Sequence, residues 1–242
     1  MNDLFYPKAG HGIEAEYIRP LAKSPTEFTR LSMTPSRDAF SCSRSEEELE
    51  TLGHTGALNW IRQFKTQDTI NKLSRNNLRW YEMNTDSLAD LVMFINYGDR
   101  LFVGRVNPPS FADQRLVLLR PHEVIDIELH HALLNSAITM FILEGLGFGR
   151  GLGALDLNKD RIEEYMHILD ASRLNEDGIN NIKAAFALMT QRDILPVPNE
   201  LKKADRIAFD DAVIEAFGLP ISRVAIYDSL LSLVKIRGNA LA

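Results

Sequence analysis

The pattern of apolar residues changes at Pro121, and this change constrains the fold more than any other feature of the chain. Before Pro121, apolar and polar residues alternate in short runs separated by turn residues, as in half-buried strands. The expected strands span residues 39–43, 78–83, 91–96, 101–106 and 115–119. After Pro121, apolar residues recur every three or four positions, and the expected helices span residues 129–143, 158–169, 176–192, 205–217 and 222–236.

These patterns predict an α+β protein. Residues 1–126 are expected to form a small, mostly antiparallel sheet with long loops, and residues 127–242 a helical C-terminal half that packs on it. Two helices are also expected before the change. Ser45 and Glu48 have the spacing of a capping box and predict a helix over residues 46–52, and a second helix is expected over residues 56–64.

The composition excludes several classes of protein. The 242 residues are 45% hydrophobic and 25% charged, which is typical of a globular domain and unlike a disordered chain. A single cysteine, Cys42, excludes a disulfide framework and a cysteine-based zinc site. The longest apolar stretch, residues 132–148, contains polar residues and is shorter than the about 20 residues of a membrane span. We therefore expect a cytoplasmic protein with no membrane partner.

The charge is unevenly distributed along the chain. The first 120 residues carry equal numbers of basic and acidic residues, so the second half carries the whole net charge of -6. Within the balanced first half, residues 58–81 are locally basic, because they contain five cations and one carboxylate. These charges are interspersed with Trp60, Phe64, Trp80 and Tyr81. Cations bind phosphates and aromatic faces stack on bases, so this mixture suits a nucleic acid. The alternative is a solvated helix face backed by core aromatics.

Two segments have the composition of methyltransferase motifs but not their context. Asn107-Pro108-Pro109-Ser110 has a serine where amine-specific methyltransferases have an aromatic residue that stacks on the flipped base. The glycine run over residues 148–153 follows a predicted helix, whereas a cofactor loop follows a strand. We interpret the first as a loop at the sheet edge and the second as a bend, and neither as catalytic.

A cluster of histidines and carboxylates extends from His122 to His131. Such residues can bind a metal ion, but His130 and His131 are adjacent and point in different directions on a helix. Acidic residues at the start of a helix complement its dipole, which gives a structural explanation for the cluster. A small metal-dependent hydrolase or nuclease built on this cluster is one alternative function.

Four segments together, and in this order, resemble the target-recognition region of bacterial N6-adenine DNA methyltransferases of type II restriction–modification systems. The first is Glu16–Pro25, which contains Tyr-Ile-Arg-Pro-Leu-Ala-Lys-Ser, and the second is Leu101–Val106. The third is Leu133-Leu134-Asn135-Ser136-Ala137, followed by the glycine bend and Gly153–Leu157. The fourth is the C-terminal pattern of Arg206, Asp210, Gly218-Leu219, Tyr227, Leu230, Leu233-Val234 and Arg237.

This resemblance implies sequence-specific DNA recognition by a C-terminal region without its catalytic domain. No S-adenosylmethionine site is expected in this chain, because the family places the cofactor in a preceding catalytic domain. The implied partners are double-stranded DNA and a catalytic methyltransferase domain or subunit, and the chain alone is not expected to be an enzyme. The candidate phosphate contacts are Arg62, Lys65, Lys72 and Arg75, and the candidate base contacts are Arg79, Arg105, Asn107, Gln114 and Arg150.

Two further alternatives share the same fold prediction. The chain can be a stand-alone specificity or adaptor subunit that binds a methylase or nuclease through its helical half. It can also be a protein-interaction module of a defence system without DNA contact.

Overall fold

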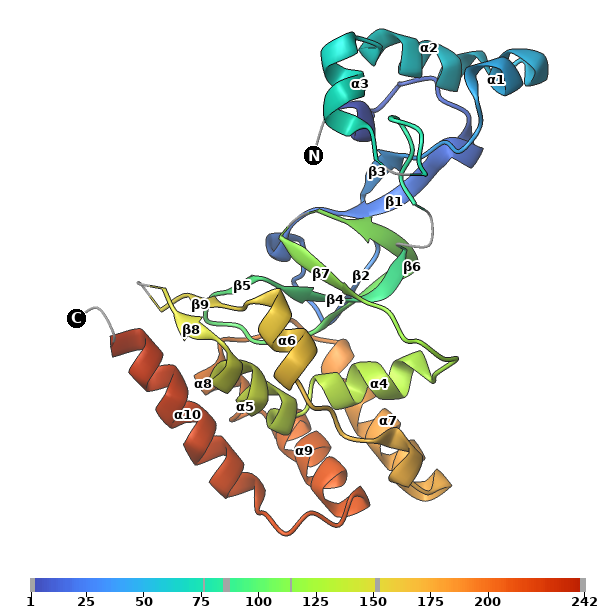
Figure 1. The fold of residues 1–242 in the computed structure, drawn as a ribbon. Coiled ribbons are helices and arrows are strands. Elements are labelled where there is room, and N and C mark those ends of the chain that lie inside the picture. The colour runs from blue at the N-terminus through green and yellow to red at the C-terminus, as the bar shows by residue number, and fades with distance from the viewer. Residues whose placement is uncertain (1–2, 76, 85–87, 114, 151–152, 240–242) are drawn as a thin grey trace.

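A computed structural model describes residues 3–75, 77–84, 88–113, 115–150 and 153–239. It has the α+β architecture expected from the sequence. Figure 1 shows an N-terminal helical part, a central sheet and a C-terminal helical part arranged one after another along the long axis of the molecule. Gln114 lies outside the described residues.

The central sheet is mixed and has the strand order β3-β1-β6-β4-β7, with β2 pairing to β6. Its strands are β1 (Ile18–Ala22), β2 (Ser32–Met33), β3 (Arg37–Phe40), β4 (Ala89–Phe94), β6 (Gly104–Ala112) and β7 (Leu116–Leu119). The pairs β1–β3, β4–β6 and β4–β7 are antiparallel, whereas β6 runs parallel to β1 and β2. The long strand β6 therefore joins the two ends of the sheet.

A second, smaller sheet connects distant segments of the chain. It contains β5 (Asn96–Tyr97), β9 (Leu155–Asp156) and β8 (Phe148–Gly149), all antiparallel. The strand β8 opens the glycine run, so this part of the predicted bend is held by backbone pairing to β9.

The N-terminal part folds around a small core made of buried residues between Leu4 and Met83 together with Phe111. It contains the 3-10 helices η1 (Asp3–Phe5) and η2 (Ala15–Tyr17) and the helices α1 (Glu46–Leu52), α2 (Thr55–Phe64) and α3 (Gln67–Leu73). The capping box predicted at Ser45 and Glu48 is present. A further 3-10 helix, η3 (Pro25–Glu27), follows β1.

The C-terminal helices pack against the opposite end of the sheet (Figure 1) and share a large core with strands β4, β6 and β7. They are α4 (Ile127–Leu134), α5 (Ala137–Leu146), α6 (Lys159–Tyr165), η5 (Ala171–Arg173), α7 (Glu176–Thr190), α8 (Val197–Glu200), α9 (Ala204–Ala216) and α10 (Arg223–Asn239). This core draws on residues from both sides of position 126. The predicted division of the chain at 126/127 stays a prediction.

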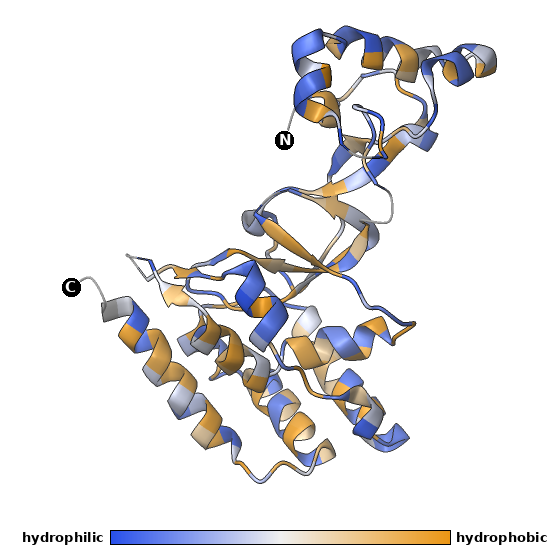
Figure 2. Cartoon of the chain, in the orientation of Figure 1, coloured by the Kyte–Doolittle hydropathy of each residue, from blue (hydrophilic) through white to orange (hydrophobic). Residues whose placement is uncertain are grey.

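Apolar residues concentrate in the central strands and in α5, α9 and α10 (Figure 2). Among the described helices, none is both long and apolar enough to cross a membrane.

Three local expectations were wrong. Residues 78–83 do not form a strand but an irregular segment, of which Tyr81 and Met83 are buried in the small core. The helix expected over 129–143 is two helices, α4 and α5, separated at Asn135 and Ser136. Asn107–Pro109 is not an edge loop, because it lies within β6, although its three side chains are exposed.

Candidate nucleic-acid interface

Arg62 in the last turn of α2 and Lys65, the residue after it, were expected to bind phosphate but bind carboxylates of α1 instead. The Nζ atom of Lys65 lies 2.6 Å from Oε1 of Glu46, and Nε of Arg62 lies 3.4 Å from Oε2 of the same side chain. Arg62 also binds Glu50. Both cations are about half exposed, so the ion pairs lie at the surface and link α1 to α2. Their positive charge is locally neutralised.

The cations further along this segment differ in their pairing. Lys72 binds Asp68 one helical turn away, with 2.8 Å between Nζ and Oδ2. Arg79 lies between Glu48 and Glu82, at 4.0 and 3.9 Å. Arg75 is exposed and has no ion-pair partner within the part of the chain that the structure describes. Among the cations predicted in residues 58–81, Arg75 is therefore the one best placed to bind an external anion.

The aromatic residues of the same segment pack against the small core. The Trp60 indole N–H donates to the Leu4 carbonyl at 2.8 Å, and its ring meets Phe64 edge-on at 5.1 Å between centroids. Tyr81 is buried and donates its hydroxyl to the Arg44 carbonyl at 2.8 Å. These contacts match the alternative of core aromatics behind a solvated helix face.

The predicted base contacts lie at separate places in the fold. Arg105 and Asn107 are on β6, where Asn107 is exposed and Arg105 lines a pocket against α4 and α7. Arg150 follows β8 and is 73% exposed, and its Nε lies 2.8 Å from Oδ2 of the buried Asp156. Arg79 is on the N-terminal part. The structure does not bring these residues into one cluster.

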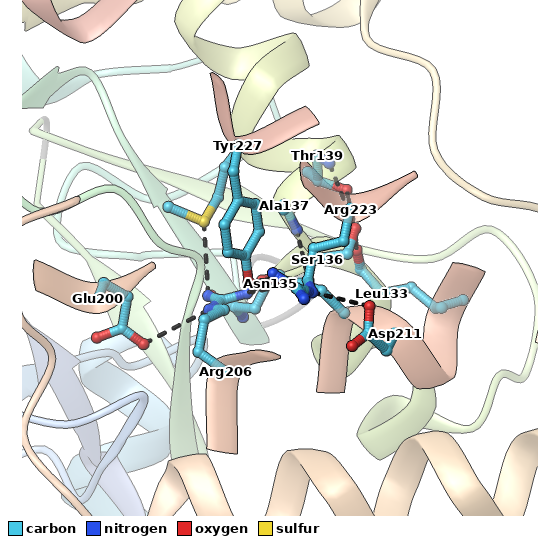
Figure 3. Close-up of polar contacts among 12 residues, drawn as sticks. Leu133, Asn135, Ser136, Ala137, Thr139, Glu200, Arg206, Asp211, Arg223 and Tyr227 are labelled. Atoms are coloured by element: carbon cyan, nitrogen blue, oxygen red, sulfur yellow. Dashed lines mark hydrogen bonds and ion pairs between the residues drawn. The ribbon is translucent and has the colours of Figure 1, made fainter. Parts of the chain in front are cut away.

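The resemblance singled out residues that meet in a buried polar network (Figure 3). Asp210 of α9 accepts hydrogen bonds from the Ala137 N–H at 2.8 Å and from the Tyr227 hydroxyl at 2.7 Å. Arg206, one turn earlier on α9, donates to the Asn135 carbonyl at 2.6 Å and lies 3.4 Å from Asp210. The network therefore connects the start of α5 with α9 and α10.

The same network fixes the break between α4 and α5. The Asn135 side chain accepts from the Val103 N–H at 3.0 Å and donates to the Val103 carbonyl at 2.9 Å, so it replaces a strand partner for that residue. Ser136 caps α5 by accepting a hydrogen bond from Thr139 N–H. Leu-Leu-Asn-Ser thus ends one helix, bonds the residue that precedes β6 and begins the next helix.

A second polar cluster is formed by two carboxylates around Arg192, which follows α7. Arg192 donates to both oxygens of Glu200, at 2.7 and 2.9 Å, and to Asp205 at 2.5 Å. Burial alone raises the pKa of Glu200, but the hydrogen bonds from Arg192 and the charge of Arg206 outweigh burial. The pKa of Glu200 therefore lies below its usual value.

Arg237, near the end of α10, holds the small sheet against the helices. Its Nε donates to Oε1 of the buried Glu144 at 2.7 Å, and its Nη1 donates to the carbonyls of Gly98 and Gly153. Burial raises the pKa of Glu144, while the charge of Arg237 lowers it, and burial prevails. The resemblance, and not the charge pattern, singled out Arg206, Asp210, Tyr227 and Arg237. Their buried contacts give all four a structural role.

The histidine cluster has no metal-binding geometry within the described ranges, where no three His, Cys, Asp or Glu side chains converge. His131 is buried, hydrogen-bonds the Val103 carbonyl through Nε2 at 3.0 Å, and packs edge-on against Phe186. Burial is the main cause that lowers the pKa of His131 to about 4. His130 instead bonds the Asp126 carbonyl through Nδ1.

A large cleft among the described residues was not anticipated from the sequence. It has a volume of about 1030 Å³ and lies between the free edge of β7, the segment that follows it, and α6. Its floor is apolar, with Leu91, Leu134 and Ile162, and its rim carries Arg120 and Lys159.

No family model and no curated protein matches this chain. Among solved structures, the chain is similar to the type IIG restriction endonuclease BpuSI, with a TM-score of 0.66 and 11% sequence identity. The match covers 99% of this chain and 29% of that protein. The chain shares the fold of one part of that enzyme. It spans less than a third of the enzyme's length, and at this identity the likeness concerns the fold alone.

Proposed function

We propose that this chain is a DNA-recognition module of a restriction–modification system. The observation that carries the proposal is the fold match of nearly the whole chain, 99% of it, to part of a type IIG restriction endonuclease. The four segments that resemble target-recognition regions support it, since three of them contribute to the contacts between sheet and helices: Val103, Asn135, and Arg206 with Asp210. The finer proposal is recognition for adenine-N6 methylation.

In this function, exposed cations bind phosphates and a few side chains reach base edges. Arg75 is the best candidate phosphate contact, because no carboxylate among the described residues neutralises it. Asn107 and Arg150 are exposed and can reach base edges. Most other candidate cations must exchange a carboxylate for a phosphate, so binding by the chain alone is expected to be weak and sensitive to salt.

The test titrates a labelled random-sequence duplex with the chain and monitors binding by fluorescence anisotropy at several salt concentrations. With about four phosphate contacts, affinity is expected to fall roughly 100-fold between about 50 and 200 mM salt. Arg75→Gln is expected to reduce the slope of log affinity against log salt by about 1. The matched control is Lys202→Gln, an exposed cation in the turn after α8. Binding that is absent, independent of salt, or equally weakened by both substitutions contradicts the proposal.

The proposed division of labour places the cofactor in a catalytic methyltransferase partner. Calorimetric titration of this chain with S-adenosylmethionine is expected to give no binding, and a tritiated-methyl transfer assay on genomic DNA is expected to give no signal. If the cofactor binds and methyl groups are transferred, the chain is itself a methyltransferase and the proposed module is wrong.

One observation favours a second candidate, a stand-alone adaptor without DNA contact. Six of the cations predicted to bind DNA have a carboxylate oxygen within 4.0 Å, namely Arg62, Lys65, Lys72, Arg79, Arg105 and Arg150. An adaptor predicts no change in anisotropy with any duplex at low salt, together with a stable complex with a methylase or nuclease subunit.

A further inference from the structure

Arg105 lies on β6 beside Ser32 of β2, and together they line one side of a small pocket. The backbone N–H of Arg105 donates to the Leu31 carbonyl at 2.8 Å, so the position of the strand is fixed. The opposite side is formed by α4 and α7, and the pocket has a volume of about 300 Å³. Its polar lining consists of Ser32, Arg105, Glu128, Lys183, Thr190 and Gln191, besides the bonded His131.

The guanidinium of Arg105 is incompletely bonded within the described chain. Its side chain is 24% exposed, and the buried Nε has no hydrogen-bond partner among the described residues. Its Nη1 lies 3.7 Å from Oε1 of Glu128, which is an ion pair but too long for a hydrogen bond. Buried donors are normally bonded, so the unbonded Nε leaves the guanidinium of Arg105, which lines the pocket, without its full set of acceptors among the described residues.

Glu128 joins this arginine to a second cation. The Nζ atom of Lys183 lies 3.2 Å from Oε2 of Glu128 and 2.9 Å from Oδ2 of Asp126. Glu128 is 59% exposed and extends from the first turn of α4. Its carboxylate therefore lies between Arg105 and Lys183 and is more than half exposed, so an incoming anion can displace it from Arg105.

The remaining polar groups of the pocket suit an oxyanion. Ser32 is exposed and contributes a hydroxyl, and the Gln191 amide, which bonds the Thr190 hydroxyl at 3.2 Å, carries a second N–H. Arginine and lysine with hydroxyl and amide donors are the groups that bind phosphate oxygens. His131 contributes no charge near neutral pH, because burial lowers its pKa to about 4.

We propose that the pocket between β6, α4 and α7 binds a phosphate oxyanion, with Arg105 as its principal ligand and Glu128 as the internal anion that the phosphate replaces. Two sources share this chemistry, the backbone of DNA and a phosphate-bearing small molecule. The DNA source rests on the function proposed above, whereas the oxyanion site does not.

The experiment titrates the full chain with inorganic phosphate and follows the Nε–Hε cross-peak of Arg105 by nuclear magnetic resonance. Chloride added to the same ionic strength is the reference. A saturable shift specific to phosphate is expected. Glu128→Gln removes the competing carboxylate and is expected to tighten phosphate binding about tenfold, the effect of one charge-assisted interaction.

Arg105→Gln is expected to abolish the saturable phosphate shifts at Ser32 and Gln191. The matched control, Arg115→Gln, changes an exposed arginine outside this pocket and is expected to bind phosphate like the unmodified chain. The proposal is overturned if neither the unmodified chain nor Glu128→Gln shows a saturable shift. It is also overturned if Arg105→Gln, with an unchanged spectrum elsewhere, binds phosphate normally.

Duplex titrations of the same variants separate the two sources. If Arg105→Gln weakens both phosphate and duplex binding, the DNA backbone supplies the oxyanion. If it abolishes phosphate binding and leaves duplex affinity unchanged, the oxyanion site stands and takes a small phosphate-bearing ligand. If no variant binds duplex while phosphate still binds through Arg105, the oxyanion site stands and the DNA-recognition function fails.

Discussion

Replacing Asp210 by Asn tests whether the buried network holds the helices together. The carboxylate accepts hydrogen bonds from Ala137 and Tyr227 and faces Arg206 at 3.4 Å, and Arg206 and Asp210 are each 2% exposed. Removing one partner of a buried ion pair costs about 3–5 kcal/mol. Glu200 lies 3.5 Å from Nε of Arg206 and still offsets part of its charge. We therefore expect the lower end, a loss of about 3 kcal/mol in the free energy of unfolding.

The adjacent Asp211 supplies the control. Asp211 pairs with Arg223 at 2.8 Å but is 54% exposed, so Asp211→Asn is expected to cost about 0.5 kcal/mol. Urea unfolding at neutral pH, followed by far-ultraviolet circular dichroism, measures both losses. Tryptophan fluorescence does not serve here, because Trp60 and Trp80 both lie in the N-terminal part. If Asp210→Asn costs no more than Asp211→Asn, the network does not contribute the stability derived from its geometry.

Three further substitutions and one titration give defined outcomes. In helix α2, Gly56→Ala places a methyl group 2.0 Å from a backbone carbonyl oxygen, so it is expected to destabilise the chain by more than about 1 kcal/mol. In α5, the methyl group of Gly145→Ala meets open space, so this substitution is expected to stabilise the chain by about 0.5–1 kcal/mol. Urea unfolding measures both changes. Because the pKa of Glu200 is lowered, its contribution to the stability of the fold is present above the unfolded-state pKa, near about 4.3, and is lost as the pH falls through the lower folded-state pKa. Arg192→Met should therefore lose less stability than the unmodified chain between neutral and acidic pH. His131 should show no protonation in a magnetic-resonance titration until the pH approaches about 4, and a transition near about 6.5 would contradict its burial.

Local signals predicted most helices correctly. The Ser45–Glu48 capping box defines the start of α1, and apolar spacing located α2, α7, α9 and α10 to within one or two residues at most ends. These signals depend on contacts between residues three or four positions apart, which the sequence contains explicitly. The α+β class followed from the same patterns.

The failed strand at residues 78–83 has a tertiary cause. Its alternating apolar residues resemble a strand, yet the Glu82 N–H donates to the Arg79 carbonyl at 2.9 Å, and Glu82 accepts from the Arg79 N–H at 3.1 Å. This turn lets Tyr81 and Met83 enter the small core from irregular backbone. Alternation alone records burial and does not distinguish a strand from such a segment.

The candidate interface shows the same limit. The sequence identified cations and aromatics near one another, but not which carboxylates neutralise them. The Glu46 partner of Lys65 lies 19 positions away, and the Asp156 partner of Arg150 belongs to another strand. The pocket at Arg105 needs β2, β6, α4 and α7 together.

The sequence by itself determined the class of fold, most of the longer helices, the capping box at Ser45 and Glu48, and the residues of the C-terminal pattern. Only the tertiary structure decided that Arg206, Asp210 and Tyr227 meet the start of α5. It alone also decided that Arg105, whose Nε has no partner among the described residues, lines a pocket. The physical reason is range. Secondary structure follows from neighbouring residues, whereas the pairing of a buried charge depends on which distant elements the core brings together.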